Sequence, residues 1–216
     1  MKILVIGASG KTGREVVQQA IDAGEQVTAF VRDAARLTIR GPGLTVFEGD
    51  VTDPQDLRNA LAGQDAVIST LGARARSTVS GPFRTKADEG LMQKSTAALI
   101  EAAEAEGVRR VVVMSTFMLA PNFRAGILKP LELYYKSMND DKRAAEELLR
   151  RSPLDWTIVW ATRLTDGEPS SAARLVPVTE TVTPRNTIAR SDAAAFLLAQ
   201  VKDHKTIRRE AVCTGN

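Results

Sequence analysis

Three glycines, Gly7, Gly10 and Gly13, stand between an apolar run at residues 2–6 (KILVI) and a helical stretch that follows them. The run is short and rich in β-branched residues, which predicts a strand, so the glycines occupy a strand–turn–helix connection. Such a turn needs glycine because a phosphate must approach the backbone N–H groups of the helix N-terminus closely. A second apolar run at residues 26–31 completes a βαβ unit of about 30 residues. This context predicts a phosphate-binding loop that opens a nucleotide-binding fold.

The spacing of the glycines distinguishes two kinds of phosphate-binding loop. A Walker A loop places a glycine five positions before Gly10, but that position is Val5, inside the predicted strand. The dinucleotide motif G-x-G-x-x-G places a glycine at Ser9, whereas this chain has G-x-x-G-x-x-G, in the sequence GASGKTG. The loop therefore excludes a P-loop kinase and favours a variant dinucleotide-binding loop. We expect Ser9, Lys11 and Thr12 to contact the cofactor together with the glycines.

Strand and helix patterns alternate along the rest of the chain, which predicts an α/β, Rossmann-like, doubly wound parallel sheet with helices on both faces. The pair Asp53 and Pro54 is typical of a helix start, since aspartate caps the first turn and proline suits the first helical position. We expect one domain over residues 1–216, with a small substrate-side lobe after about residue 160 and a long loop at residues 74–85. Further strands are expected at residues 44–47, 66–71, 110–114, 155–160 and 210–214, and helices at residues 55–61, 86–106, 131–151 and 191–201.

Length, composition and charge limit the kinds of partner. The chain has 216 residues, of which 44% are hydrophobic and 25% charged, so disordered and coiled-coil structures are excluded. The net charge of +3 does not indicate a nucleic-acid partner, and the basic segment at residues 202–209 contains Asp203, which favours a solvated turn. No apolar run approaches the ~20 residues that cross a bilayer, so no membrane partner is expected. No apolar stripe predicts a dimer, and a monomer is the default expectation.

Cysteine and histidine are too few for the common metal sites. Cys213 and His204 are each the only residue of their kind, which excludes an intramolecular disulfide, a multi-cysteine zinc site and a histidine cluster. We therefore expect no metal. The chain enters its first strand at Ile3 without a signal peptide, which together with the cysteine count predicts a cytoplasmic protein. His204 is expected to be exposed and not to act as a general base.

The residues after the second strand bear on the choice of cofactor. NAD enzymes place a carboxylate there to accept a hydrogen bond from the ribose 2′-hydroxyl, but here Arg32 follows Val31. A guanidinium suits a 2′-phosphate through charge-assisted hydrogen bonds, and Arg36 adds a second positive charge. These residues predict NADP as the cofactor. Asp33 keeps NAD as the alternative, since its carboxylate can turn toward the ribose if Arg32 points into solvent.

Several further segments carry a family resemblance that extends over nearly the whole chain. Together with GASGKTG they resemble the NmrA-like, NAD(P)-binding branch of the atypical short-chain dehydrogenases/reductases, and within it the biliverdin-IXβ and flavin reductases. The resemblance implies a Rossmann fold and a reductase activity. The segments are FVRD at residues 30–33, EGDVTD at 48–53, DEGL at 88–91, AAEAEGVRRVVVMST at 102–116, DDKRAAEELLRRSPLDWTIV at 140–159 and IARSDAAAFLL at 188–198.

The same resemblance implies cofactor contacts at the ends of the predicted strands. In open α/β sheets, ligands bind outside the carboxyl ends of the strands, which is where these residues lie. By position in the family, the adenine would lie between Asp50 and Val51, the middle of the cofactor would pass Leu71 and Gly72, and the nicotinamide would face Ser115 and Thr116.

The chain departs from the family pattern at the usual proton donor. Ordinary short-chain reductases use a Tyr-x-x-x-Lys pair, in which the tyrosine donates the proton and the lysine binds the nicotinamide ribose. Lys142 matches the lysine, but Met138 stands where the tyrosine belongs, and Tyr134 and Tyr135 lack the required spacing. The remaining candidates for catalytic residues are Lys142 itself and Ser115, as a helping hydroxyl.

The missing acid bears on the substrate. Reduction of a ketone needs a positioned acid, typically worth roughly 10²–10⁴ in rate, whereas an electron-poor conjugated ring that accepts hydride can take its proton from water. The sequence therefore predicts an NADPH-dependent reductase of a small conjugated acceptor, namely a flavin, a quinone or a biliverdin-like tetrapyrrole. The alternative is a non-catalytic redox sensor that binds NADP, which loss of the tyrosine favours. Sugar-nucleotide epimerisation is disfavoured by the same absence.

Overall fold

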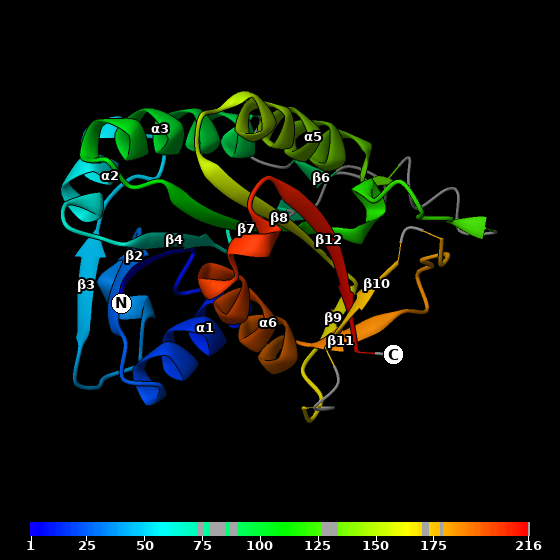
Figure 1. Ribbon diagram of the computed structural model, residues 1–216, viewed down its shortest axis with the longest axis horizontal. Helices are drawn as coiled ribbons and strands as arrows, with labels where there is room; N and C mark the ends of the chain where they lie inside the picture. Colours follow the sequence, from blue (N-terminus) through cyan, green and yellow to red (C-terminus); the bar gives the residue numbers. More distant parts are fainter. Residues whose placement is uncertain are drawn as a thin grey trace.

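The structure is a computed structural model that describes residues 1–72, 76–77, 85–86, 90–126, 134–169, 173–177 and 179–215. Its centre is an eight-stranded sheet (Figure 1). β10 runs antiparallel to β12, and the other neighbouring strands are parallel, which confirms the predicted doubly wound α/β fold. In order across the sheet, the strands are β10 (Arg174–Val176), β12 (Arg209–Thr214), β8 (Asp155–Ala161), β7 (Arg110–Thr116), β4 (Ala66–Ser69), β1 (Lys2–Ile6), β2 (Gln26–Val31) and β3 (Leu44–Glu48).

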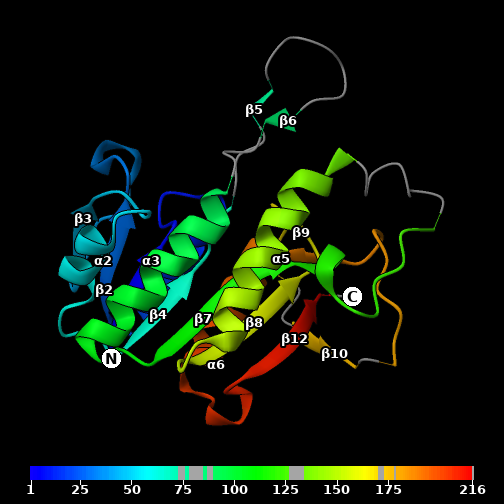
Figure 2. The same ribbon diagram turned by 90° about the horizontal axis from the view of Figure 1, so that it is seen from above.

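Helices cover both faces of the sheet, as Figures 1 and 2 show from two directions. On one face, α1 (Lys11–Asp22) packs beside α6 (Arg190–Lys202). On the other face, α3 (Leu91–Glu106) lies between α2 (Pro54–Leu61) and α5 (Lys136–Arg151). The sheet is therefore the middle of three layers.

Each face of the sheet has its own apolar core. In β1, Ile3 and Val5 belong to the core under α1 and α6, whereas Leu4 and Ile6 belong to the core under α2 and α3. All four side chains are at most 1% exposed. Side chains alternate along a strand, so a strand that is covered on both faces must be apolar throughout, as this run is.

The chain reverses its direction across the sheet beside β1. From β1 it proceeds outward through β2 and β3 and then returns to β4, on the other side of β1. Ligands of open α/β sheets bind at the carboxyl ends of the strands flanking such a reversal, because the connecting loops diverge there. The glycine loop, residues 7–13, follows β1 at this point, so the fold places it where a ligand is expected.

The start of α3 differs from the prediction. The helix was predicted from residue 86 but begins at Leu91. Gly90 precedes it with a left-handed φ of 71°, which interrupts the helical backbone. Residues 85–86 instead form β6 (Thr85–Lys86), which pairs antiparallel with β5 (Arg76–Ser77). The rest of the predicted loop at residues 74–85 lies outside the described residues.

Two other predicted bounds need correction. α5 was predicted from residue 131 but begins at Lys136, and residues 131–133 lie outside the described part of the chain. β4 was predicted to reach residue 71 but ends at Ser69, so Thr70 and Leu71 belong to the loop that follows it. An apolar residue after a strand prolongs the pattern in the sequence even where the backbone has left the sheet.

Most of the C-terminal region completes the main layers. α6 packs on α1, and β12 pairs in parallel with β8. Outside these layers, β9 (Arg163–Thr165) pairs with β11 (Thr187–Ala189) in a separate small sheet. Strands of three residues are too short to show a periodic pattern. The predicted substrate-side lobe is therefore limited to the segments around this small sheet.

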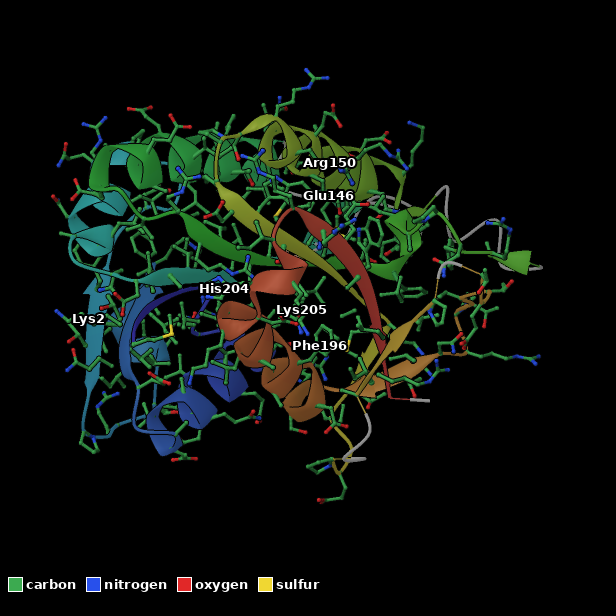
Figure 3. All side chains as sticks on the ribbon, viewed as in Figure 1. Lys2, Glu146, Arg150, Phe196, His204 and Lys205 are labelled. Atoms are coloured by element: carbon green, nitrogen blue, oxygen red, sulfur yellow. The ribbon has the colours of Figure 1, made fainter. Side chains whose placement is uncertain are left out.

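Neither a membrane-spanning helix nor a metal-binding cluster is found among the described residues. None of their helices is both long and apolar enough to cross a membrane, and they contain no group of three or more His, Cys, Asp or Glu residues placed to hold a metal ion. Cys213 is a buried free thiol, and burial raises its pKa to about 12, so it stays protonated. His204 is exposed in η4 (His204–Thr206), at the end of the sheet where β12 begins (Figure 3).

Candidate functional site

A cleft of about 280 Å³ opens at the carboxyl ends of β1, β2 and β4 and at the loop after β3. It lies where the chain reverses across the sheet, as expected for a ligand site in this fold. Residues from four separate segments that were singled out in the sequence meet there. The predicted cofactor contacts that line the cleft are Gly7, Ser9, Gly10, Arg32, Arg36, Asp50, Val51, Leu71 and Gly72.

The glycine loop forms a close-packed cradle at the head of the cleft. Gly13 lies in the first turn of α1, where an added Cβ atom would be 2.2 Å from the Gly7 carbonyl oxygen. Gly7 has a φ of 79°, and an added Cβ atom there would lie 3.1 Å from the backbone nitrogen of Leu71. Gly10 is the N-cap of α1, and no side chain of the described residues caps that helix. The first N–H groups of α1 thus face a site that fits a phosphate.

Thr70 is the most informative cleft residue that the sequence analysis missed. Its hydroxyl lies 3.1 Å from the Ile6 carbonyl oxygen and 3.4 Å from that of Gly7, so it ties the end of β4 to the glycine loop. Local sequence cannot reveal this contact, because it depends on β1 and β4 being neighbours in the sheet. The other missed lining residues are Ile6, Phe30, Val31, Thr52 and Leu91.

The turn after β3 forms the rim predicted to hold the adenine. The Asp50 carboxylate accepts hydrogen bonds from the backbone N–H and the hydroxyl of Thr52, both at 2.8 Å. These bonds, with a smaller contribution from the charge of Arg32, hold the pKa of Asp50 below its ordinary value, so the group is ionised and fixed. Phe30 lines the cleft and stacks on Phe47 with ring centroids 5.4 Å apart, which gives an apolar wall suited to a flat ring.

The two arginines predicted to select the cofactor are exposed and line the same cleft. Arg32 follows β2 directly, and Arg36 ends η1 (Ala34–Arg36). The carboxylate of Asp33 accepts a hydrogen bond from the Ala35 N–H at 3.0 Å, as the N-cap of η1. One oxygen of the carboxylate that could favour NAD is therefore used within the turn, and Arg32, Asp33 and Arg36 all line the cleft.

Three predicted contacts have side chains outside the cleft. The Lys11 amine pairs with the Asp166 carboxylate at 2.7 Å on the outer surface of the glycine loop. Thr12 is buried, and the Thr116 hydroxyl accepts a hydrogen bond from the Met118 N–H at 3.4 Å. The motif predicts which residues form the loop, but the direction of each side chain depends on the helix and turn that it joins. A cofactor contact from the buried Thr12 would have to come from its backbone, and one from the Lys11 amine would require its exposed ion pair with Asp166 to open.

Ser115 and Lys142 line a second, smaller cavity of about 20 Å³ under α5. Consecutive residues at the start of α3 line the two sites, Leu91 the cleft and Met92 the cavity. Ser115, near the end of β7, is 7% exposed, and its hydroxyl has no hydrogen-bond partner among the described residues. A buried polar group without a partner costs about 1–3 kcal/mol, so a polar ligand atom that reached it would be favoured.

Lys142 contributes a desolvated ammonium group to this cavity. The side chain is half-buried, and burial lowers the pKa of the ammonium, while the negative charges of Glu146 and then Asp141 raise it. A lysine in such a setting is a strong electrostatic partner for a ligand, because water screens it little. The structure thus places the two predicted catalytic residues, Ser115 and Lys142, at one cavity.

No tyrosine among the described residues joins this cavity. Met138 is half-buried one turn before Lys142 on α5. Tyr134 and Tyr135, the two tyrosines of the chain, precede α5 and pack edge to face with their ring centroids 4.9 Å apart. The proton donor of ordinary short-chain reductases therefore has no tyrosine substitute at this cavity.

Replacing Ser115 with alanine is expected to lower kcat by about tenfold or less, the contribution of one hydrogen bond, because the hydroxyl orients a ligand without being an obligatory acid. The free energy of unfolding should not fall, and it should rise by up to about 1–3 kcal/mol, because alanine removes a buried hydroxyl that has no hydrogen-bond partner among the described residues. Lys142→Ala, in contrast, should mainly raise KM for the cofactor. Steady-state kinetics and thermal unfolding measure both effects, and a loss of ~10⁴ in kcat for Ser115→Ala would contradict an acid-independent reaction.

The chain belongs to a family described as NAD(P)H-binding, which matches residues 7–204. This match confirms the predicted NAD(P)-binding Rossmann domain and agrees with the resemblance to atypical short-chain dehydrogenases/reductases. One relative is the photosystem II assembly factor Ycf39 of Synechocystis, which is 31% identical over 160 residues. The aligned part covers 74% of this chain and 44% of that protein, so the chain spans less than half of this relative's length.

Solved structures share the fold over nearly the whole chain. The anaerobillin reductase ChuY of Escherichia coli has a TM-score of 0.77 and 22% identity, with 99% of this chain and 96% of that chain covered. A short-chain dehydrogenase/reductase (wide type) of Veillonella parvula, solved in complex with NADP, has a TM-score of 0.76 and 20% identity, with 98% and 93% covered. At such identities the likeness establishes a common fold.

Proposed function

We propose that the protein is an NADPH-dependent reductase that transfers a hydride to a small conjugated acceptor, namely a flavin, a quinone or a biliverdin-like tetrapyrrole. The observation that carries the proposal is the cavity of Ser115 and Lys142. Its lining among the described residues includes a hydroxyl and an ammonium group but no tyrosine, and the start of α3 lines both this cavity, through Met92, and the cleft, through Leu91. Such a site can bind and polarise an acceptor, and it suits one that needs no proton from the protein.

The residues of the cleft suit the pyrophosphate and the 2′-phosphate of NADPH. The cradle of Gly7, Gly10 and Gly13 suits the pyrophosphate, because a side chain at Gly13 would collide with backbone and one at Gly7 or Gly10 would lie only 3.1 Å from backbone atoms. Arg32 and Arg36 suit the 2′-phosphate, since two cationic residues line the cleft, and Asp33, which also lines it, uses one carboxylate oxygen to cap a turn. NADPH supplies the hydride when it is bound.

The chain's own groups provide binding and electrostatics near the nicotinamide end. Lys142 would hold the nicotinamide ribose, and its charge would stabilise negative charge that develops on the acceptor. The Ser115 hydroxyl would find in the ligand the hydrogen-bond partner that the protein does not give it. The partner that this proposal requires is a small molecule, and neither a nucleic acid nor a membrane takes part in it.

A panel of acceptors tests the proposal. Purified protein with NADPH should reduce FMN, a quinone or a bilin, and should show little activity on simple ketones, because no tyrosine of the described residues lines the cavity as their proton donor. NADPH oxidation with each acceptor, followed against an enzyme-free control, is the measurement. Tight NADPH binding without turnover of any acceptor would contradict the reductase and support a redox sensor. The sensor is the second candidate because the tyrosine is absent and because a relative is named as an assembly factor.

A further inference from the structure

Glu146 is a buried carboxylate on the sheet-facing side of α5, one helical turn after Lys142. The residue is 5% exposed, and Figure 3 shows it with Arg150 between α5 and the sheet. Glu146 and Lys142 both line the small cavity that contains Ser115. Residues four apart on a helix lie side by side, so the carboxylate is a close neighbour of the ammonium.

Two anchors fix the Glu146 carboxylate away from Lys142. One oxygen accepts a hydrogen bond from the Trp160 indole N–H at 2.9 Å, and the other accepts one from the Arg150 guanidinium at 2.9 Å. Arg150 is itself held by the Glu210 carboxylate at 2.6 Å. Both oxygens of Glu146 are therefore engaged, and the carboxylate can neutralise Lys142 only through space.

Lys142 has no carboxylate within 4 Å of its amine among the described residues. Asp141, which directly precedes Lys142 on α5, binds the start of α3. Its two oxygens accept hydrogen bonds from the Met92 and Gln93 N–H groups at 3.0 Å each. The cavity residues of α3 and β7 are uncharged, and the Arg150 guanidinium on α5 donates to the Glu146 carboxylate at 2.9 Å. Glu146 is thus the main group that offsets the cost of a buried ammonium at this place, and it does so without pairing to it.

We propose that Glu146 is a positioning residue, which keeps Lys142 charged but unpaired, so that the ammonium remains available to a ligand in the Ser115 cavity. The charge relation, meaning the effect of the Glu146 charge on the Lys142 ammonium, does not depend on the proposed function. The use of that ammonium in holding the nicotinamide ribose rests on the proposed function. A direct ion pair with Glu146 would also keep the lysine charged, but the ammonium would then be less available to a ligand.

Glu146→Gln tests the charge relation without any cofactor. Glutamine keeps an oxygen for the Trp160 indole but carries no charge, so burial of Lys142 is no longer offset and its pKa should fall below that of the parent. The measurement is an NMR pH titration of the Lys142 side chain in ¹³C-lysine-labelled protein, assigned with Lys142→Arg. A Lys142 pKa that is unchanged or higher in Glu146→Gln would overturn the proposal.

A matched control lies next to Glu146 on the same helix. Glu147 is 47% exposed and pairs with Arg151 at 2.8 Å and with Arg150 at 3.6 Å. Glu147→Gln therefore removes the same charge at the surface, while Arg150 keeps its shorter contacts with Glu146 and Glu210. Solvent screens that charge, and the Lys142 titration should stay as in the parent. An equal fall in both variants would show a general effect of net charge and would also overturn the proposal.

Trp160→Phe tests the anchoring. It removes one of the two anchors and leaves Arg150 in place, so Glu146 gains freedom to turn toward Lys142. The Lys142 pKa should then rise above that of the parent, opposite to its fall in Glu146→Gln. A fall in both variants would show that the indole does not hold the carboxylate back. Glu146→Gln alone decides the charge relation if Trp160→Phe does not fold.

Calorimetric titration of NADPH across pH connects the charge relation to ligand binding. The affinity should decline with rising pH as Lys142 loses its proton, and the decline should begin at a lower pH in Glu146→Gln than in the parent. Identical pH profiles in the two proteins, alongside a shifted Lys142 titration, would show that the ligand does not use this ammonium. The NMR result is independent of turnover, so failure of this inference is distinguishable from failure of the reductase proposal.

Discussion

Gly13→Ala is expected to weaken NADPH binding by about 100-fold or more and to lower the free energy of unfolding by roughly 1–3 kcal/mol. An alanine Cβ would lie 2.2 Å from the Gly7 carbonyl oxygen and 2.9 Å from the Ala8 Cα. Both neighbours are backbone atoms, so no side-chain rotation relieves the clash, and the turn from Gly7 to Gly10 must move. That turn presents the N–H groups to the phosphate, which is why binding should suffer more than folding.

Gly167→Ala is the control for this variant. Gly167 does not line the cleft, an added Cβ atom there would lie 3.7 Å from the Thr165 hydroxyl oxygen, which is an ordinary contact distance, and the backbone does not adopt a left-handed conformation. Its NADPH affinity and thermal midpoint should stay close to those of the parent. Calorimetric titration and thermal unfolding of both variants are the measurements. Gly13→Ala that binds NADPH as the parent does would contradict the phosphate cradle.

Arg32→Ala is expected to weaken NADPH binding by about 10- to 150-fold and to leave NADH binding nearly unchanged. A charge-assisted hydrogen bond contributes roughly 1.5–3 kcal/mol, and the proposed contact exists only with the 2′-phosphate. The preference for NADPH should collapse rather than invert. Inversion needs a free carboxylate that faces the ribose. One oxygen of the Asp33 carboxylate already accepts a hydrogen bond from the Ala35 N–H.

Arg40→Ala is a control that removes one positive charge, as Arg32→Ala does, but outside the cleft. The Arg40 guanidinium bonds to the Leu37 and Ile39 carbonyl oxygens at 2.6 and 2.7 Å and does not line the cleft, so this variant should keep the preference for NADPH. Titration of both nucleotides into the parent and both variants separates the outcomes. Equal losses for NADPH and NADH in Arg32→Ala would assign Arg32 to the fold or to the shared pyrophosphate site. An unchanged NADPH affinity would make it a surface charge.

The fold was predictable from sequence because its signals are local. The run KILVI, the glycine loop and the strand at residues 26–31 each carry their structure within a few residues, and β2 has the predicted bounds. The late start of α3 was not predictable in the same way. Helical spacing continues backward past Gly90, and only its left-handed backbone shows where the helix begins.

The candidate site was predictable where the family pattern fixes a backbone position, as at Gly10, Arg32 and Asp50. It was not predictable where function depends on contacts between distant segments. Thr70 reaches Ile6 across 64 positions of sequence because β1 and β4 are neighbours. The Lys11 amine forms an ion pair with the Asp166 carboxylate, although the position of Lys11 in the loop favours a cofactor contact. Such side-chain directions are set by packing that the local sequence does not encode.

Hydride transfer itself is the central claim, and a single-turnover experiment tests it most directly. Protein loaded with NADPH should lose the absorbance of the reduced nicotinamide when it is mixed with FMN, a quinone or a bilin. With at least one of these acceptors, the loss should be slower when the transferable hydrogen at C4 is deuterium. The account is contradicted if NADPH binds tightly and its absorbance stays constant with every acceptor.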